Sequence, residues 1–596
     1  MKILLIFAIA GSIALMIVGE QRSSRTSAAP AEGCMFCHKK VSDPDPSHPV
    51  TVFGCHSCHL GNPYSMDKDR GHFTMVKNPG DLDVVDRTCG QTKCHPEIVA
   101  RVKNSLMATN RGIIRSLEQR WDGVESLRSV ENLLAETSAD GIAIDQYRKM
   151  CGGCHLWKKR GDSADEVDRR GGGCSNCHVM EKGKRDPIVA ADFEHTRMTT
   201  RIPPENCTKC HNRSGRIGLS YFGKFESEGY GTPYEGWELN QRTLSGERFY
   251  LDLPADVHHS KAGLSCIDCH TETEVMGDGK RHERIKDQLE VTCEACHSPS
   301  FSVVKDPESL PVKLAFLNKQ IPGLIGAEIG VTKRGSLLYN LQKKEERTIL
   351  YRKADGKQMD VPLSTAGAHH RLPGHERLSC QACHSNWMPQ CYGCHIEYRK
   401  TGSQKDWLSG KDTPGQFQEF RSHIRFSKPT LGITPSGRVS PMSPCEVFVS
   451  VIPKEGVDEQ DRSFNHLTLS AFDPHTTQKS ARTCIDCHGD PKTLGFGEGN
   501  LFPDKTSWKF RPTYANGTGS GDVSFTHDTL VGKPVQTLTS ESSRPFDREE
   551  LERVLSVKTC LPCHQRYEDK IYRDFRESGR RFEKEEDLPC RQAVRR

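Results

Sequence analysis

Nearly all of the cysteines in this chain fall into twelve short motifs in which a histidine directly follows the second cysteine. The chain has 596 residues with 26 cysteines and 26 histidines, and the motifs hold 24 of the cysteines. Eleven have the form CxxCH: Cys34/Cys37/His38, Cys55/Cys58/His59, Cys151/Cys154/His155, Cys174/Cys177/His178, Cys207/Cys210/His211, Cys266/Cys269/His270, Cys293/Cys296/His297, Cys380/Cys383/His384, Cys391/Cys394/His395, Cys484/Cys487/His488 and Cys560/Cys563/His564. The twelfth is a stretched C-x4-CH, Cys89/Cys94/His95. The motifs are numbered 1 to 12 in chain order, so that Cys89 begins motif 3.

This pattern predicts covalent attachment of haem. The two thiols of a CxxCH motif form thioethers with the porphyrin vinyl groups, and the adjacent histidine ligates the iron. Random placement of these residues would give on the order of 0.05 matches in the whole chain. Zinc ribbons and disulfide frameworks also use paired cysteines, but neither requires a histidine after every second one. We therefore expect twelve covalently bound haems c.

The composition agrees with a chain that packs around macrocycles. Hydrophobic residues make up only 35% of the sequence, which is low for a chain of this length. Porphyrins are large apolar plates that can supply the missing core. The expected fold is mostly loops and short α-helices wrapped around a chain of stacked haems, with minor β-hairpin insertions. Several consecutive motifs are closely spaced, which predicts an assembly of di-haem units.

Motif spacing divides the sequence into four regions. Residues 1–29 resemble a signal peptide, since an apolar run at 3–18 precedes small residues, and an uncleaved membrane anchor is the alternative. Residues 30–298 are haem-dense and carry motifs 1 to 8. Residues 299–400 hold a predicted β-hairpin insertion and motifs 9 and 10, whose short tether should bring two haems together. Residues 401–596 carry motifs 11 and 12 and a terminal helix. We expect the protein to be exported to the periplasm or beyond.

Local patterns predict several elements between the motifs. Alternating residues flank Asp355-Gly356 and predict a hairpin over 348–363. A short strand is expected at 444–452 and a long surface loop at 500–545. Helices are expected within 96–136 and within 547–586, the latter with Asp547 as its N-cap.

Fourteen further histidines are candidates for the second axial position on each iron. Their number is close to the twelve positions to be filled, which predicts that nearly all haems are bis-histidine ligated. They are His48, His56, His72, His195, His258, His259, His282, His369, His370, His375, His423, His466, His475 and His527.

Several of these histidines stand close to a motif. His48, His259, His375 and His475 each precede one by a few residues, so each can ligate a neighbouring haem while its own motif holds the next. His56 lies inside motif 2 and can turn towards a different iron. His258-His259 and His369-His370 are adjacent pairs, whose side chains would point to opposite sides of an extended chain and serve two haems.

The formal charge of +5 does not indicate a nucleic-acid partner. Two propionates per haem would bring the net charge to about −7 in the oxidised state and about −19 in the reduced state.

The motifs, the histidines that precede them and the sequence CHSCH at 55–59 resemble those of multihaem c-type cytochromes. The similarity is strongest to the periplasmic and extracellular electron conduits and filament-forming nanowire cytochromes of metal-, sulfur- and nitrogen-metabolising prokaryotes. This resemblance implies bis-histidine haems in a continuous chain of parallel and T-shaped pairs. It also implies redox partners such as other cytochromes, a quinol-oxidising membrane complex or extracellular acceptors, and homo-oligomers or filaments.

Two alternatives to a pure electron carrier remain open. A multihaem oxidoreductase would keep one haem accessible to a nitrogen or sulfur compound, although the sequence lacks the CxxCK motif of some nitrite reductases. A haem subunit of a membrane quinol oxidoreductase would suit an uncleaved N-terminal helix. The two cysteines outside the motifs, Cys445 and Cys590, can form a disulfide, remain inert thiols or act in the function, and Cys445 is a candidate haem ligand or sulfur-handling group.

Overall fold

The computed structural model describes residues 32–584, with gaps at 40, 137–138, 162–166, 181–194, 213–216, 228–241, 245–247, 305–322, 365–371, 453–463, 498, 505–506, 513–537 and 540–542. The chain forms two compact units. Unit 1 comprises Met1–Glu136, Gly153–Ile202 and Val275–Gln288, and unit 2 comprises Thr137–Gly152, Pro203–Glu274 and Leu289–Arg596. The division falls between Gly152 and Gly153, inside motif 4. The predicted signal region 1–29 lies outside the described residues.

Unit 1 is built from short helices. They are α2 (Cys34–Cys37), α3 (Val50–Phe53), α4 (His56–His59), α5 (Lys68–His72), η1 (Val85–Arg87), α6 (Pro96–Asn104), α7 (Leu106–Thr109), α8 (Arg111–Asp122), α9 (Val130–Ala135), α11 (Ser175–His178) and α17 (Ile285–Gln288). The prediction of helix within 96–136 is confirmed, as four helices. Asn110 and Gly123, both with positive φ, end α7 and α8. Val85, Val99 and Val102 are buried in the apolar core that α6 covers.

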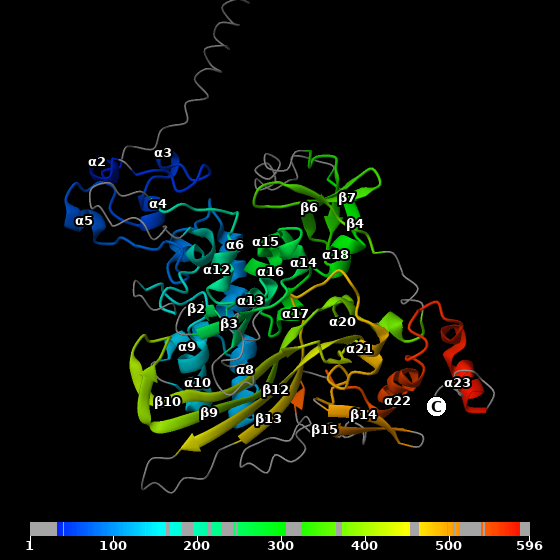
Figure 1. The fold of residues 1–596 in the computed structure, drawn as a ribbon. Helices are drawn as coiled ribbons and strands as arrows, with labels where there is room; N and C mark the ends of the chain where they lie inside the picture. Colours follow the sequence, from blue (N-terminus) through cyan, green and yellow to red (C-terminus); the bar gives the residue numbers. More distant parts are fainter. Residues whose placement is uncertain are drawn as a thin grey trace, which may run out of the picture. The chain divides into compact units, whose positions relative to one another are not determined.

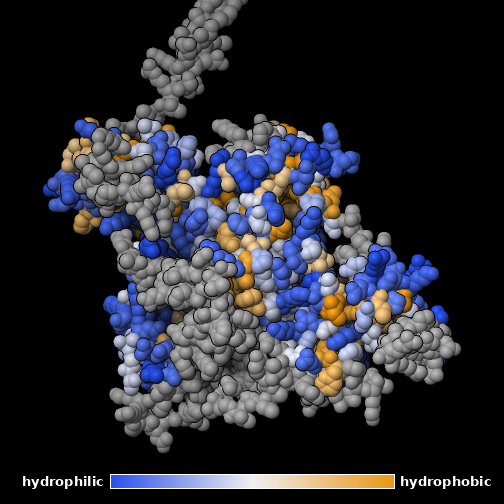
Figure 2. All heavy atoms as spheres, viewed as in Figure 1, coloured by the Kyte–Doolittle hydropathy of each residue, from blue (hydrophilic) through white to orange (hydrophobic). Residues whose placement is uncertain are grey.

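Unit 2 contains a five-stranded sheet where the sequence predicted one hairpin. Its antiparallel order is β4 (Ser300–Val303), β5 (Glu328–Val331), β6 (Leu337–Lys344), β7 (Arg347–Tyr351) and β8 (Gln358–Asp360). The predicted hairpin is confirmed as β7 and β8, and Gly356 in the turn has φ +73°. Leu324, Ile329 and Tyr351 are buried on one side. Figure 2 shows hydrophobic side chains among hydrophilic ones at the surface over this sheet.

A second sheet has much longer strands than the sequence predicted. Its order is β10 (Asp412–Ser427), β9 (Met388–Lys405), β12 (Val439–Ile452), β13 (Phe464–Ala471) and β16 (Leu538–Thr539), and β11 (Leu431–Ile433) pairs with β12. Figure 1 shows β9, β10, β12 and β13 running side by side. The strand predicted at 444–452 is confirmed within β12. Motif 10, at 391–395, lies inside β9 rather than in a helical turn.

Two smaller sheets hold the other described strands of unit 2. One has the order β1 (Lys224–Ser227), β3 (Arg248–Asp252), β2 (Arg242–Leu244), and the other is the hairpin β14 (Gly499–Asp504) with β15 (Ser507–Pro512). The loop predicted over 500–545 is therefore wrong for its first residues, which pair as antiparallel strands. Leu501, Trp508 and Phe510 share one face of this hairpin and pack against an apolar core. Residues 513–537 lie outside the described chain.

Most helices of unit 2 are also short. They are α10 (Gly141–Gln146), the π-helix η2 (Tyr147–Cys151), α12 (Pro204–Thr208), α13 (Ile217–Tyr221), α14 (Val257–Ser260), α15 (Cys266–Cys269), α18 (Cys293–His297), η4 (His375–Arg377), α20 (Cys380–His384), α21 (Cys484–His488), α22 (Arg548–Ser556), η6 (Val557–Thr559), η7 (Lys570–Asp574) and α23 (Phe575–Lys584). The helix predicted within 547–586 is confirmed in pieces. α16 (Glu272–Met276) spans the division between the units.

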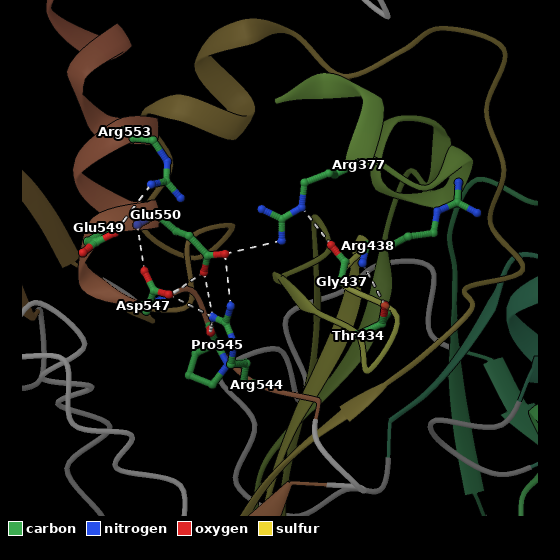
Figure 3. Close-up of polar contacts among 10 residues, drawn as sticks. All are labelled: Arg377, Thr434, Gly437, Arg438, Arg544, Pro545, Asp547, Glu549, Glu550 and Arg553. Carbon is green, nitrogen blue, oxygen red and sulfur yellow. Dashed lines mark hydrogen bonds and ion pairs between the residues drawn. The ribbon is translucent and has the colours of Figure 1, made fainter. Parts of the chain in front are cut away.

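The N-terminus of α22 bears out the predicted cap. The Asp547 side chain accepts a hydrogen bond from the Glu550 amide at 2.8 Å, and the Glu550 carboxylate accepts one from the Asp547 amide at 3.0 Å. Glu550 is buried, and it also pairs with Arg544 at 2.7 Å and with Arg377 at 3.4 Å (Figure 3). Through Glu550, the cap therefore connects α22 to the segment that precedes it and to η4.

Replacing Asp547 with Ala should lower the free energy of unfolding by about 1 kcal/mol, because the first amides of α22 lose their acceptor. Urea unfolding followed by far-UV circular dichroism measures this change. Glu549→Ala removes a carboxylate from the same turn without touching the cap and should leave the midpoint unchanged. Equal effects of the two variants would contradict a capping role.

Candidate haem-binding sites

The local sequence explains why most motifs fold as one helical turn. Such a turn brings residues i and i+3 to the same side, so both thiols can reach one porphyrin. Motifs 7 and 11 share the sequence CIDCH and begin with capping boxes, Ser265 with Asp268 and Thr483 with Asp486. In motif 9, Ser379 accepts a hydrogen bond from the Ala382 amide. This capping signal was present in the sequence and was missed there.

The stretched motif 3 closes in the same way as the others. In motifs 1, 2, 5, 6, 7 and 12 the histidine amide donates to the carbonyl of the first cysteine at 2.9–3.1 Å. In motif 3 the His95 amide donates to the Cys89 carbonyl at 2.9 Å, although two more residues lie between them. The backbone conformation therefore supports motif 3 as an attachment site of the same kind.

In several motifs a backbone hydrogen bond of a local turn also positions the second cysteine. In motifs 5, 6 and 12 the amides of Cys177, Cys210 and Cys563 donate to the carbonyl of the first cysteine at 3.2–3.3 Å. In motif 3 the longer spacing changes this contact, and the Cys94 amide donates to the Gln91 carbonyl at 2.8 Å instead. Cys94 and Cys563 are exposed, whereas Cys177 and Cys210 are half-buried.

Motif 4 differs from these motifs because its first cysteine ends the π-helix η2. Its second cysteine, Cys154, is half-buried, and its Sγ atom accepts a hydrogen bond from the Arg170 guanidinium at 3.1 Å. In the described structure, the cysteines of motifs 1, 2, 3, 7, 8, 9 and 11 are not joined in disulfides. Thiols in this state fit thioether attachment of haem.

Among the described residues, six motif histidines each face one of the fourteen candidate histidines. The ring centroids lie 6.0–6.2 Å apart, within one unit in every case. The pairs are His38 with His72 (motif 1), His59 with His195 (motif 2), His95 with His48 (motif 3), His270 with His475 (motif 7), His297 with His258 (motif 8) and His488 with His375 (motif 11).

This separation fits an iron between the two rings. With an imidazole–metal bond of about 2 Å on each side, the centroids of two opposed rings lie about 6 Å apart. Rings in direct stacking contact would be closer. The residues present therefore fit a haem at each of these six motifs, with both histidines available as axial ligands.

The other six motif histidines are not members of these pairs, and four of them lie in different surroundings. His155 of motif 4 is buried, at 4% exposed, whereas His211 of motif 6 is exposed. His564 of motif 12 is half-buried, and its Nδ1 atom lies 3.5 Å from the Asp569 carboxylate. His395 of motif 10 lies in β9, between the paired strands β10 and β12. Their ligation of iron, and the second ligand of each iron, stay predictions.

Hydrogen bonds at Nδ1 leave Nε2 free to ligate in many of these histidines. An acceptor at Nδ1 fixes the proton there and orients the ring. Carbonyl oxygens accept from the motif histidines His59, His178, His297, His384 and His488 at 2.7–3.3 Å. Carbonyls also accept from His195 at 2.8 Å and His475 at 3.0 Å. Carboxylates accept from His48 (Asp45, 2.7 Å), His258 (Asp256, 2.8 Å) and His270 (Glu274, 2.8 Å).

Burial keeps several of these rings neutral, which iron ligation requires. Desolvation, followed by the neighbouring His270, lowers the pKa of His475 to about 4. Desolvation is also the largest cause that lowers the pKa values of His59, His95 and His488.

Three described candidate histidines do not face a motif histidine at this spacing. His56 donates from Nδ1 to the buried Glu32 carboxylate, which also accepts from the Cys55 amide. His282 Nε2 lies 3.0 Å from both carboxylate oxygens of Asp278. The His259 ring packs edge-on against Phe222, with centroids 4.8 Å apart.

The expectation of an extended His258-His259 dipeptide is wrong, because both residues lie in α14. The Asp256 side chain begins this helix by accepting from the His258 amide. The two rings still reach different surroundings, since His258 faces His297 while His259 packs on α13 and the residue after it.

The remaining predicted residues are placed only in part. His423 and His466 lie in β10 and β13, and Cys445 lies in β12 opposite Thr468. His369, His370, His527 and Cys590 lie outside the described residues. Their predicted roles as ligands or as a disulfide stay predictions.

In unit 1, pairwise contacts connect four motifs one after another, and such a series of neighbouring motifs is called a line below. One ligand atom each of Cys34, Cys55 and Glu32 lie within 4.8 Å of one another, joining motifs 1 and 2. The side-chain amide of Gln91 in motif 3 donates to the backbone carbonyl of Ser57 in motif 2 at 2.8 Å, so these two motifs are in contact.

A thiol contact adds motif 5 to this line. A hydrogen bond with Cys174 lowers the pKa of Cys89 to about 7, which joins motifs 3 and 5. The order of neighbours in unit 1 is therefore motif 1, 2, 3 and 5.

Six motifs form a second line in unit 2. Contact with Cys207 lowers the pKa of Cys266 to about 7, joining motifs 6 and 7, and contact with Cys293 does the same for Cys380, joining motifs 8 and 9. Cys269 is close enough to Cys296, in motif 8, for the two thiols to interact electrostatically.

Motifs 9, 11 and 12 extend the line. Ala382 and Cys487 pack in one apolar core, and Figure 1 shows α20 and α21 side by side. The Cys484 Sγ atom lies 3.9 Å from the Gln565 carbonyl, directly after motif 12. The order of neighbours in unit 2 is therefore motif 6, 7, 8, 9, 11 and 12.

Exposed apolar side chains within or beside the motifs also fit a macrocycle. Phe36 lies inside motif 1, Phe73 follows His72, and Ile485 lies inside motif 11, and all three are exposed. Among the described residues we find no helix that combines the length and apolar character needed to cross a membrane.

Comparison with known proteins supports the same chemistry over part of the chain. Residues 206–298, which contain motifs 6, 7 and 8, match the family model described as cytochrome c554 and c-prime. No curated protein and no solved structure matches the chain. The match supports a c-type cytochrome with covalently bound haem c that takes part in electron transport.

Proposed function

We propose that the protein is a twelve-haem electron-transfer cytochrome in which most irons have two histidine ligands. The observation that carries this proposal is the set of six histidine pairs at 6.0–6.2 Å, each joining a motif histidine to a histidine from elsewhere in the chain. Two ligands from the protein leave no open position for a substrate. Each bound haem would supply a one-electron Fe(III)/Fe(II) couple.

The chain's own residues have three tasks in this function. The cysteines fix each haem at its edge, and the axial histidines hold it from both faces. The acceptors at Nδ1 set the orientation and donor strength of the histidines. The contacts between neighbouring motifs would bring bound haems close together, which supports electron transfer along motifs 1, 2, 3 and 5 in unit 1 and along motifs 6, 7, 8, 9, 11 and 12 in unit 2.

We infer the cellular setting from the attachment chemistry and the N-terminal sequence. An exported location in the periplasm or outside the cell, with residues 3–18 as part of a signal or an anchor, agrees with both. Partners would then be other cytochromes, a quinol-oxidising membrane complex or an extracellular acceptor, and end-to-end filaments are a further form. Electron transport in anaerobic respiration is the role that fits these partners.

Electron paramagnetic resonance of the oxidised, purified protein tests the proposal, with the haems counted by mass spectrometry. We expect a mass increase equal to twelve haems and only low-spin ferric signals, because every iron would be six-coordinate. A stoichiometric high-spin signal would contradict the pure carrier and favour the oxidoreductase alternative. Nitrogen and sulfur oxyanions would then be screened as substrates, first with a Cys445→Ser variant.

A further inference from the structure

The acceptors at Nδ1 differ in charge from one axial histidine to another. In the pair at motif 2, His59 and His195 both donate to carbonyl oxygens, and in the pair at motif 11, His488 also donates to a carbonyl. In the pairs at motifs 7 and 8, one histidine donates to a carboxylate instead. Neutral and anionic acceptors do not have the same effect on the imidazole.

Glu274 is built into the site at motif 7. Its Oε2 atom lies 2.8 Å from His270 Nδ1, and its Oε1 atom accepts from the amides of Glu290 and Val291 at 2.6 and 2.5 Å. The side chain is 1% exposed, so water does not screen its charge. The two backbone amides donate to Oε1 and stabilise the charged form of this buried carboxylate.

Asp256 is the carboxylate acceptor at motif 8, where it contacts the second histidine of the pair, His258, and not the motif histidine. Its Oδ1 atom lies 2.8 Å from His258 Nδ1, and its Oδ2 atom accepts from the Thr477 amide at 2.7 Å. The side chain is 3% exposed. Thr477 follows His475 by two residues, so Asp256 also fixes the segment that carries the second histidine of motif 7.

An anionic acceptor at Nδ1 increases the basicity of the imidazole at Nε2. A more basic axial ligand favours Fe(III) over Fe(II) and therefore lowers the reduction potential, and low dielectric strengthens the effect. Motifs 7 and 8 are also neighbours in the line of unit 2, through Cys269 and Cys296.

We propose that Glu274 and Asp256 lower the reduction potentials of the haems at motifs 7 and 8, making them a low-potential pair within unit 2. This inference rests on the bis-histidine ligation proposed above. The pair would be the last in its line to be reduced, and electrons would cross it against a local rise in free energy. Both carboxylates act through a histidine and are positioning residues. Asp45 makes the same contact with His48 in the pair at motif 3, so the argument extends to unit 1.

Redox titration followed by visible absorption tests the proposal on the haem-loaded protein. Glu274→Gln keeps the size of the side chain and removes its charge. We expect one of the one-electron steps to move to a higher potential by about tenfold in its equilibrium constant, which equals 59 mV. Asp256→Asn should move a second step in the same direction.

Glu290→Gln is the matched control. Glu290 is buried beside Glu274 and accepts from the hydroxyls of Thr271 and Thr332, but in the described structure its carboxylate accepts from neither histidine of the pair at motif 7. It should shift the titration much less. An equal shift would mean that loss of any nearby charge suffices, and this would overturn the assignment.

Haem content and spin state decide how a negative result is interpreted. Unchanged steps in Glu274→Gln and Asp256→Asn, with twelve low-spin haems retained, overturn this inference and leave the proposed function intact. A high-spin signal in the parent protein counts against the proposed function instead. Should both variants lose haem, Asp45→Asn repeats the test in unit 1, where the side chain is partly exposed, and an unchanged titration there overturns the proposal.

Discussion

Replacing His475 with Ala should convert one low-spin ferric haem per chain to high spin. The His475 ring lies opposite His270 at 6.2 Å, and burial keeps it neutral with a pKa of about 4. Without it, the iron at motif 7 would keep only its motif histidine. Haem content should not change, because Cys266 and Cys269 still attach the porphyrin. Electron paramagnetic resonance of the oxidised variant measures the change, and added imidazole should reverse it.

His282→Ala serves as the control for this experiment. His282 is also a sequence-predicted ligand, but its Nε2 atom is engaged by Asp278. The low-spin signals should persist when it is removed. Complete retention of low-spin haem in His475→Ala would show that His475 is not a ligand. The separation of the facing rings would then no longer be evidence for axial ligation.

The backbone turns of most candidate attachment sites form within a few residues, and this is why such sites can be predicted from a sequence. Each motif places its cysteines and histidine within seven residues or fewer, and one backbone turn is enough to form the site. The same holds for the Asp547 cap and the β7–β8 hairpin, whose signals also lie within a few residues. Such features do not depend on how distant segments pack.

The pairing of histidines could not be predicted in this way. His475 precedes motif 11 in the sequence, yet its ring faces His270 of motif 7, and His375 precedes motif 9 but faces His488 of motif 11. These partners meet only after distant segments have packed, and loop closure does not select one partner among many. The sequence suggested that a histidine before one motif faces the histidine of a different motif, but it did not indicate which motif.

Long-range packing also explains the strands that the sequence did not reveal. β9 contains motif 10 and pairs with β10 on one side and β12 on the other. Between Cys391 and Cys394 the register shifts, so that two residues of β9 lie opposite one residue of β10. Such a bulge arises from the paired strands and has no local sequence signature here. A CxxCH motif read alone predicts a helical turn.

Asp406→Asn should destabilise unit 2 by about 3–5 kcal/mol, the usual cost of breaking a buried ion pair on one side. Asp406 Oδ2 lies 2.8–2.9 Å from the Arg148 guanidinium, and the two side chains are 4% and 2% exposed. Trp407 donates to the carbonyls of Arg148 and Lys149, which fixes the β9–β10 turn against η2. Because η2 ends at Cys151, the same change should loosen the start of motif 4. Urea unfolding of the haem-loaded protein measures the loss.

The exposed ion pair of Arg347 and Asp360 is a control that shows whether burial, and not the geometry of the pair, causes the loss of stability. It is also bidentate, at 2.6–2.7 Å, but its side chains are 65% and 61% exposed. Asp360→Asn should leave the unfolding midpoint unchanged, because water solvates either charge once its partner is gone. In the buried pair, the double variant Arg148→Met/Asp406→Leu should recover much of the stability that Asp406→Asn loses, since no uncompensated charge remains. If the double variant were as unstable as the single one, the hydrogen bonds that Asp406 accepts from Leu408 and Ser409 would be the cause, and not the buried charge.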